Sequence, residues 1–210
     1  MITNKNYSGM TFVEAIVSIL IFTIAIGGFS MLFVRIWRIN SYSLEMGQAS
    51  QGVSRGVSTA VNYLRKIRQA DNGAYPVQSV GNNDMVVFSD YDKDGVTERL
   101  HLYLENQQLK MGTTKPTGTM PKVYQSGDQE VKIIADNIVN TSSEPIFYYY
   151  NKDYPGDVSH NPLILPADVS IIRLVKILLK VNIDPNRAPE NIQIQSFVEF
   201  RNLNDYDRMK

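Results

Sequence analysis

The hydrophobic pattern in the first third of the chain changes near Trp37. Residues 10–34 are 25 consecutive positions whose only charged side chain is Glu14. At about 1.5 Å per residue, a helix of this length exceeds the roughly 30 Å hydrocarbon core of a bilayer. We therefore predict that residues 10–34 span a membrane.

Beyond Trp37 the apolar residues recur at steps of three and four, which is typical of one buried face of a helix. They are Met46, Ala49, Val53, Val57, Ala60, Val61, Leu64 and Ile67. No proline occurs before Pro76. The pattern predicts one helix from Met10 to about Ala70, on the order of 90 Å long. Asp71-Asn72-Gly73 should end it, and its second half should cover a sheet.

After Gly73 the period changes to two, in short runs of β-branched and aromatic residues. The predicted strands are residues 85–88, 100–104, 108–111, 131–134, 145–150, 170–183 and 193–200. The first two should form a hairpin around residues 90–95, and the last two should pair in an antiparallel sheet. Two loops rich in glycine and proline, residues 113–121 and 154–166, are expected at the surface. The predicted fold class is α+β.

Composition narrows the functional classes. The 210 residues are 43% hydrophobic, which is enough for one anchor and one domain. Lys plus Arg and Asp plus Glu each total 21, so no net charge attracts nucleic acid or an anionic membrane surface. The absence of cysteine excludes disulfides and thiolate chemistry. The two histidines, His101 and His160, do not have a metal-binding spacing.

Glu14 is a costly residue in an apolar segment. A charge at the centre of a bilayer costs roughly 2.5 to 3.5 kcal/mol on insertion scales, so this carboxylate should have a partner. A cleaved secretory signal is an alternative interpretation, because Lys5 precedes the apolar segment and Ala25-Ile26-Gly27 is a loose cleavage motif. The apolar segment is too long for such a signal, and signals avoid an acid at this place.

The stretch Gly9-Met10-Thr11-Phe12-Val13-Glu14, followed by about twenty apolar residues, resembles the precursors of type IV pilins and type II secretion pseudopilins. The resemblance implies that prepilin peptidase cuts between Gly9 and Met10, and that the new amine of Met10 is methylated. Glu14 would attract that amine on a neighbouring subunit, which offsets part of the cost of burying the carboxylate.

The same resemblance implies a pilin-like layout, with one long N-terminal helix packed on a C-terminal antiparallel β-domain. Its parts would be a leader (residues 1–9), an assembly half of the helix (10–34), an amphipathic half (35–70) and a β-rich domain (71–210). The implied partners are the peptidase and methyltransferase, other pilin or pseudopilin subunits, an inner-membrane assembly platform and lipid, with no sign of nucleic acid. The domain would lie outside the cytoplasm, anchored in the cytoplasmic membrane by a single span.

Two further segments, residues 139–150 and 197–203, are similar to the β-domains of minor pilins and of J-type or W-type pseudopilins. The chain departs from major pilins because its span lacks a proline, for which Gly27-Gly28 would substitute, and because it lacks a C-terminal cysteine pair. Together with the size of the chain, these departures favour a minor subunit.

An acidic loop is the one candidate for a metal site. Its acids are Asp90, Asp92, Asp94 and Glu98; the first three, with Gly95, match positions one, three, five and six of an EF-hand loop. Position twelve is His101 in place of the bidentate glutamate, and strands should flank the loop. The alternatives are a calcium loop and an acidic hairpin turn in which Asp94-Gly95 supplies the bend. Calcium is the only cofactor that the sequence suggests.

Three functions remain open. The leading prediction is a filament subunit of a pilus, competence or secretion system. The alternative is a single-span, membrane-anchored binding domain that does not polymerise. An anchored enzyme comes third, because the sequence contains no nucleophile with a base, no phosphate loop and no cluster of metal ligands with catalytic spacing. The chain is therefore predicted not to be an enzyme.

Overall fold

The computed structural model describes residues 9–141, 143–184, 186–187 and 191–204. The first eight residues of the predicted leader lie outside this range. The chain divides into two compact units, Met1–Glu45 and Met46–Lys210.

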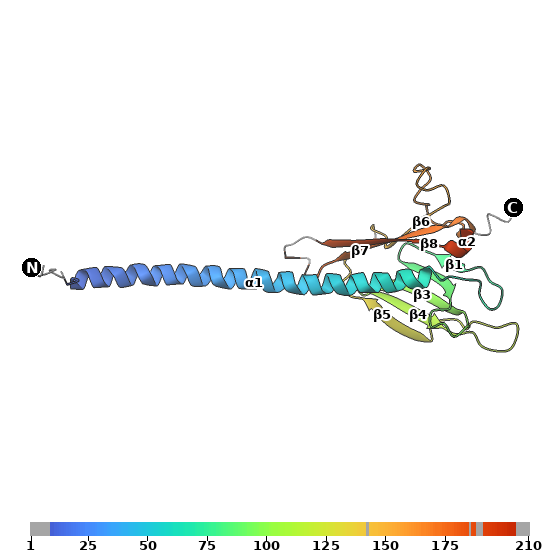
Figure 1. Cartoon of the computed structure of the whole chain (residues 1–210), viewed down its shortest axis with the longest axis horizontal. Coiled ribbons are helices and arrows are strands. Elements are labelled where there is room, and N and C mark those ends of the chain that lie inside the picture. The colour runs from blue at the N-terminus through green and yellow to red at the C-terminus, as the bar shows by residue number, and fades with distance from the viewer. Residues whose placement is uncertain (1–8, 142, 185, 188–190, 205–210) are drawn as a thin grey trace, which may run out of the picture. The chain divides into compact units, whose positions relative to one another are not determined.

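A single helix of 53 residues, α1 (Phe12–Leu64), runs from the first unit into the second (Figure 1). The prediction of one uninterrupted helix is confirmed, but its predicted end near Ala70 is wrong. The helix ends at Leu64 because the next residues join a sheet: Ile67 forms a β-bridge with Ser89, and the Arg68 amide donates to the Phe88 carbonyl at 3.0 Å. Residues 71–73 form a turn after this bridge.

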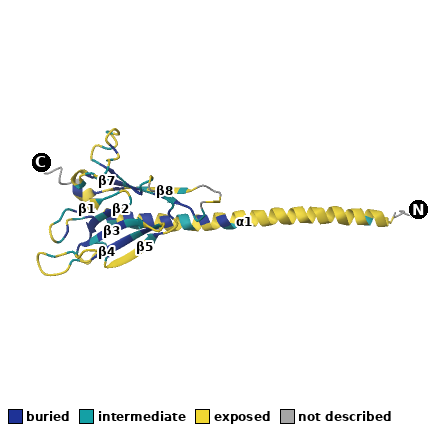
Figure 2. Ribbon diagram, turned by 180° about the vertical axis from the view of Figure 1, so that it is seen from behind, coloured by how far each residue is buried: buried dark blue, intermediate teal, exposed yellow. Residues whose placement is uncertain are grey.

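The predicted apolar face of the second half of the helix is confirmed. Each predicted position is buried except Ala49, which is half-buried. Figure 2 shows this change along α1, from an exposed first part to a partly buried last part. Gly56 lies on the buried side, where a Cβ atom would come within 2.4 Å of the Ile134 carbonyl oxygen. The helix therefore packs against the sheet too closely for a side chain at this position.

Five strands form the larger sheet in the order β1-β2-β3-β4-β5, and all neighbours are antiparallel. They are β1 (Val77–Val80), β2 (Asp84–Ser89), β3 (Glu98–Glu105), β4 (Gln108–Thr114) and β5 (Glu130–Ala135). The predicted hairpin is β2 and β3, with Met85 opposite Leu102. Strand β1 was not predicted. Strand β4 is longer than predicted, so Thr113 and Thr114 are buried strand residues and do not begin a surface loop.

Three strands form the smaller sheet, β6 (Phe147–Tyr150), β7 (Leu174–Val181) and β8 (Ile192–Glu199). The predicted pairing of the last two strands is confirmed, with Ile177 opposite Ser196. The predicted strand over residues 170–183 begins late, because a 3₁₀ turn, η1 (Val169–Ile171), precedes it. A short helix, α2 (Arg201–Asn204), follows β8.

Both sheets share one hydrophobic core with the second half of α1. The core contains Val53, Val57 and Leu64 of the helix, with residues of both sheets such as Leu102 and Ile177. The fold is thus α+β, with a long N-terminal helix and a C-terminal antiparallel domain. The core places the loop between β2 and β3 next to the chain that leaves α1.

Candidate functional site

Two groups of residues carry candidate chemistry, one at the start of α1 and one in the second unit. At the start, Gly9 and Met10 precede the helix, have no regular secondary structure and are exposed. A peptidase must reach both sides of the bond it cuts. The predicted cleavage bond therefore lies in accessible chain.

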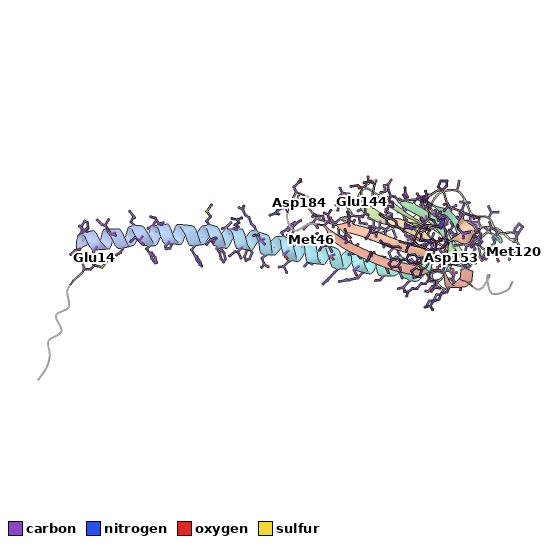
Figure 3. The ribbon with its side chains drawn as sticks, turned by 90° about the horizontal axis from the view of Figure 1, so that it is seen from above. Glu14, Met46, Met120, Glu144, Asp153 and Asp184 are labelled. Carbon is purple, nitrogen blue, oxygen red and sulfur yellow. The ribbon has the colours of Figure 1, made fainter. Side chains whose placement is uncertain are left out.

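Glu14 lies in the first turn of α1, as Figure 3 shows. Its Oε2 atom accepts from the amide and the hydroxyl of Thr11, both at 3.4 Å, and its own amide donates to Thr11 Oγ1 at 3.3 Å. This reciprocal pair is a capping box, which satisfies amides that the first turn leaves free. The Thr-x-x-Glu spacing is visible in the sequence, yet this role of Glu14 was not predicted.

The capping bonds are long and the Glu14 residue stays exposed. Around it, every residue from Phe12 to Asn40 is exposed except Ala15, which is intermediate. The most apolar 18-residue window of α1 has a mean hydropathy of 2.4 and no buried residue. By length and composition, this helix could cross a membrane as an anchor.

The second group surrounds the eight-residue loop between β2 and β3. Two residues of this loop have left-handed backbone, Lys93 with φ 65° and Gly95 with φ 89°. Asp92 Oδ1 accepts from the Asp94 amide at 3.2 Å, and Asp94 Oδ1 accepts from the Val96 amide at 2.8 Å. These local bonds fold the loop back on itself.

Arg68, in the segment that follows α1, binds this loop by hydrogen bonds and an ion pair. Its Nε donates to Thr97 Oγ1 and its Nη2 to the Gly95 carbonyl, each at 2.7 Å. Its Nη1 lies 3.4 Å from Asp90 Oδ2. One side chain from the segment after α1 therefore contacts both ends of the loop.

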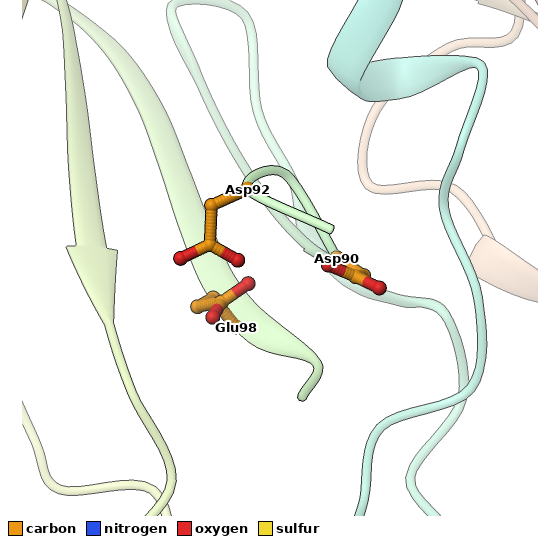
Figure 4. A group of neighbouring side chains, drawn as sticks. All are labelled: Asp90, Asp92 and Glu98. Carbon is orange, nitrogen blue, oxygen red and sulfur yellow. The ribbon is translucent and has the colours of Figure 1, made fainter. Parts of the chain in front are cut away.

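Asp90, Asp92 and Glu98 each present a carboxylate oxygen, and these oxygens lie within 4.8 Å of one another. In Figure 4 the carboxylates of Asp92 and Glu98 face each other, with Asp90 beside them. The fourth predicted ligand, Asp94, lies outside this group. The loop thus gathers three of the four acids that the sequence suggested.

Glu98 is fully buried at the start of β3. Within the described chain, neither of its carboxylate oxygens has a partner at hydrogen-bond distance, and neither does Asp90 Oδ1. Burial raises the pKa of Glu98, as do the nearby charges of Asp92 and Asp94, while the Tyr91 amide and Lys115 partly offset this. The surroundings of Glu98 in the described chain therefore disfavour its ionised form.

Lys115 lies against the acids from the chain that follows β4. Its Nζ is 3.0 Å from Asp92 Oδ2, 3.1 Å from Asp94 Oδ2 and 3.6 Å from Glu98 Oε1. Its hydrogen bonds to the two aspartates raise the pKa of Lys115. Sequence reasoning missed both Lys115 and Arg68, because their distance along the chain gives no signal.

His101, which holds position twelve of the EF-hand spacing, is engaged elsewhere. Its Nδ1 lies 3.0 Å from Asp128 Oδ2, and its ring stacks on Tyr103. Strand β3 begins at Glu98 and leads away from the loop, so that His101 lies farther along the strand. Glu98, at position nine, is therefore the acid of β3 that lies close to Asp90 and Asp92. The arrangement offers oxygen donors to a cation.

A scan against known protein families and a search of curated proteins find no match to this chain.

Proposed function

We propose that the chain is a minor pilin or pseudopilin, a structural subunit that is cut between Gly9 and Met10 and incorporated into a filament. The observation that carries this proposal is the single acid Glu14, five residues after the cut, at the start of a long apolar helix. The capping box with Thr11 alone does not require a charge here, because glutamine can cap a helix in the same way, whereas a subunit that receives a neighbour's amine needs the carboxylate.

Before assembly, the Glu14 carboxylate accepts hydrogen bonds from Thr11 in the capping box. Its long bonds to Thr11 hold the carboxylate at the end of the helix, where the positive end of the helix dipole favours a negative charge. An amine from the next subunit carries a full charge and forms a stronger hydrogen bond than a neutral hydroxyl does. The amine of Met10 on a neighbouring subunit would therefore compete well for this carboxylate.

The second candidate is a single-span binding domain that does not polymerise. The acidic group between β2 and β3 favours it, since a binding site in the domain needs no filament. Mass spectrometry of the mature amino terminus separates the two candidates. The filament proposal expects a chain that begins at methylated Met10. An intact Met1, or a cut near Gly27, would contradict it.

The role of Glu14 has its own test, in which incorporation into filaments is measured for matched variants. Glu14→Gln should be processed normally but incorporated poorly, because it keeps the size of the side chain and loses its charge. Thr11→Ala removes the cap and keeps the charge, so it should incorporate. Glu45→Gln removes a different exposed acid of the same helix and serves as the control. Normal incorporation of Glu14→Gln would refute the pairing.

A further inference from the structure

The acidic group between β2 and β3 is an unbalanced charge cluster in the described chain. Its ion pairs and close carboxylates join four acids, Asp90, Asp92, Asp94 and Glu98, to two cations, Arg68 and Lys115. Four negative and two positive charges leave a net charge of minus two. This excess negative charge attracts a cation.

Glu98 is a second, independent observation that points to a ligand at this cluster. A buried carboxylate without hydrogen bonds is expensive, and such groups are normally paired or coordinate a metal. Neither oxygen of Glu98 has a partner with full hydrogen-bond geometry in the described residues: the Tyr91 amide offsets the cost of burial only in part, and Lys115 Nζ lies 3.6 Å away. Asp90 Oδ1 is also buried and has no hydrogen-bond partner among the described residues.

The donor atoms indicate which cation fits. All of them are carboxylate oxygens, the ligands of hard cations, and the one histidine in the EF-hand spacing points to Asp128 instead. Calcium takes six to eight oxygen ligands in flexible geometry, whereas magnesium demands a near-ideal octahedron. Asp90 and Asp92 lie in an irregular loop and Glu98 is the first residue of β3, so their oxygens do not form an ideal octahedron and are better suited to calcium than to magnesium.

We propose that Asp90, Asp92 and Glu98 bind a calcium ion, and that the Lys115 ammonium occupies this position when calcium is absent. The Lys115 ammonium lies at hydrogen-bond distance from Asp92 and Asp94, but it is too far from Glu98 to form a hydrogen bond with it. Calcium displaces the ammonium, engages Glu98 and Asp90, and replaces Lys115 as the link across the loop. This inference concerns the second unit and does not depend on the proposed function.

The test is calcium titration of the full chain in detergent micelles, stripped of metal beforehand, by calorimetry and thermal unfolding. The wild-type protein should bind one calcium ion and melt at a higher temperature with calcium, because a ligand that binds only the folded state stabilises it. Magnesium at the same concentration should bind more weakly. No heat and no shift in melting temperature would overturn the proposal, and equal affinity for magnesium would overturn the assignment to calcium.

Variants separate the ligands from their competitor. Glu98→Gln should abolish binding; Asp92→Asn, whose parent side chain is 32% exposed and thus tolerates change, should weaken it at least tenfold. Lys115→Met should bind calcium about fivefold more tightly or better, since it removes a cation that repels the ion. Glu105→Gln and Lys110→Met alter an ion pair on the neighbouring hairpin and should bind like the wild type. Unchanged affinity in Asp92→Asn, or weaker binding in Lys115→Met, would refute the assigned roles.

Discussion

The two parts of α1 share one backbone conformation and have opposite surfaces. From Phe12 to Asn40 almost every side chain is exposed, although most are apolar. From Met46 to Leu64 the apolar side chains form one stripe, and that stripe is buried in the domain core. The second part thus buries its apolar side chains within its own chain, whereas those of the first part are exposed in the described chain and available to an apolar environment such as a membrane.

The largest expected difference between the two parts follows from burial. Leu64→Ala removes a fully buried side chain and should lower the free energy of unfolding of the second unit by about 2 to 5 kcal/mol. Leu32→Ala, at a position that is 58% exposed, should change it by less than about 0.5 kcal/mol. Hydrogen exchange of the β3 and β7 amides measures both. Similar losses in the two variants would contradict the division of α1.

A smaller effect is expected at two glycines of the second part. Gly56→Ala should cost about 1 to 3 kcal/mol, because its Cβ atom would clash with the Ile134 carbonyl. At Gly52 a Cβ atom meets nothing within 4 Å, so Gly52→Ala should stabilise the helix by up to about 1 kcal/mol. Thermal unfolding of the two variants should shift in opposite directions. An unchanged or higher melting temperature in Gly56→Ala would contradict close packing at this position.

The smallest effect is expected at the start of α1. Thr11→Ala removes the capping box and should destabilise the first turn by about 0.5 to 1 kcal/mol, visible as faster exchange of the amides of residues 13–15. Thr23→Ala is the control, because the Thr23 hydroxyl donates to the Ile19 carbonyl inside the helix. Faster exchange in both variants alike would mean that Thr11 has no special role as a cap.

The sequence predicted those elements whose periodicity is strong and local. The helical stripe and strand β7, with Val175, Ile177 and Leu179 buried on one parity, are of this kind. Periodicity does not reveal competition from distant residues, and so the helix was predicted to continue past Leu64 where Ile67 instead pairs with Ser89. Strand β1 has only four residues and gave no usable alternation.

The acids of the candidate metal site lie close together in the sequence, and their spacing was informative. Their partners do not: Arg68 comes from the end of the helix region and Lys115 from beyond β4, and only the folded sheet brings them together. Spacing also could not show that Glu98 is buried or that Asp94 lies outside the group of three. The capping role of Glu14 could have been predicted, since Thr11 and Glu14 have the required separation.

The strand order has a consequence for how quickly the domain can form. In both sheets every strand pairs with the strand that precedes or follows it in the chain. The connections that join β1 to β2, β2 to β3 and β3 to β4 are short, whereas residues 115–129 and 151–173 form long connections before β5 and β7. Chains rich in local contacts fold faster than those that need distant partners. The five-stranded sheet can therefore grow hairpin by hairpin as the chain emerges, before the last three strands arrive to complete the core around α1.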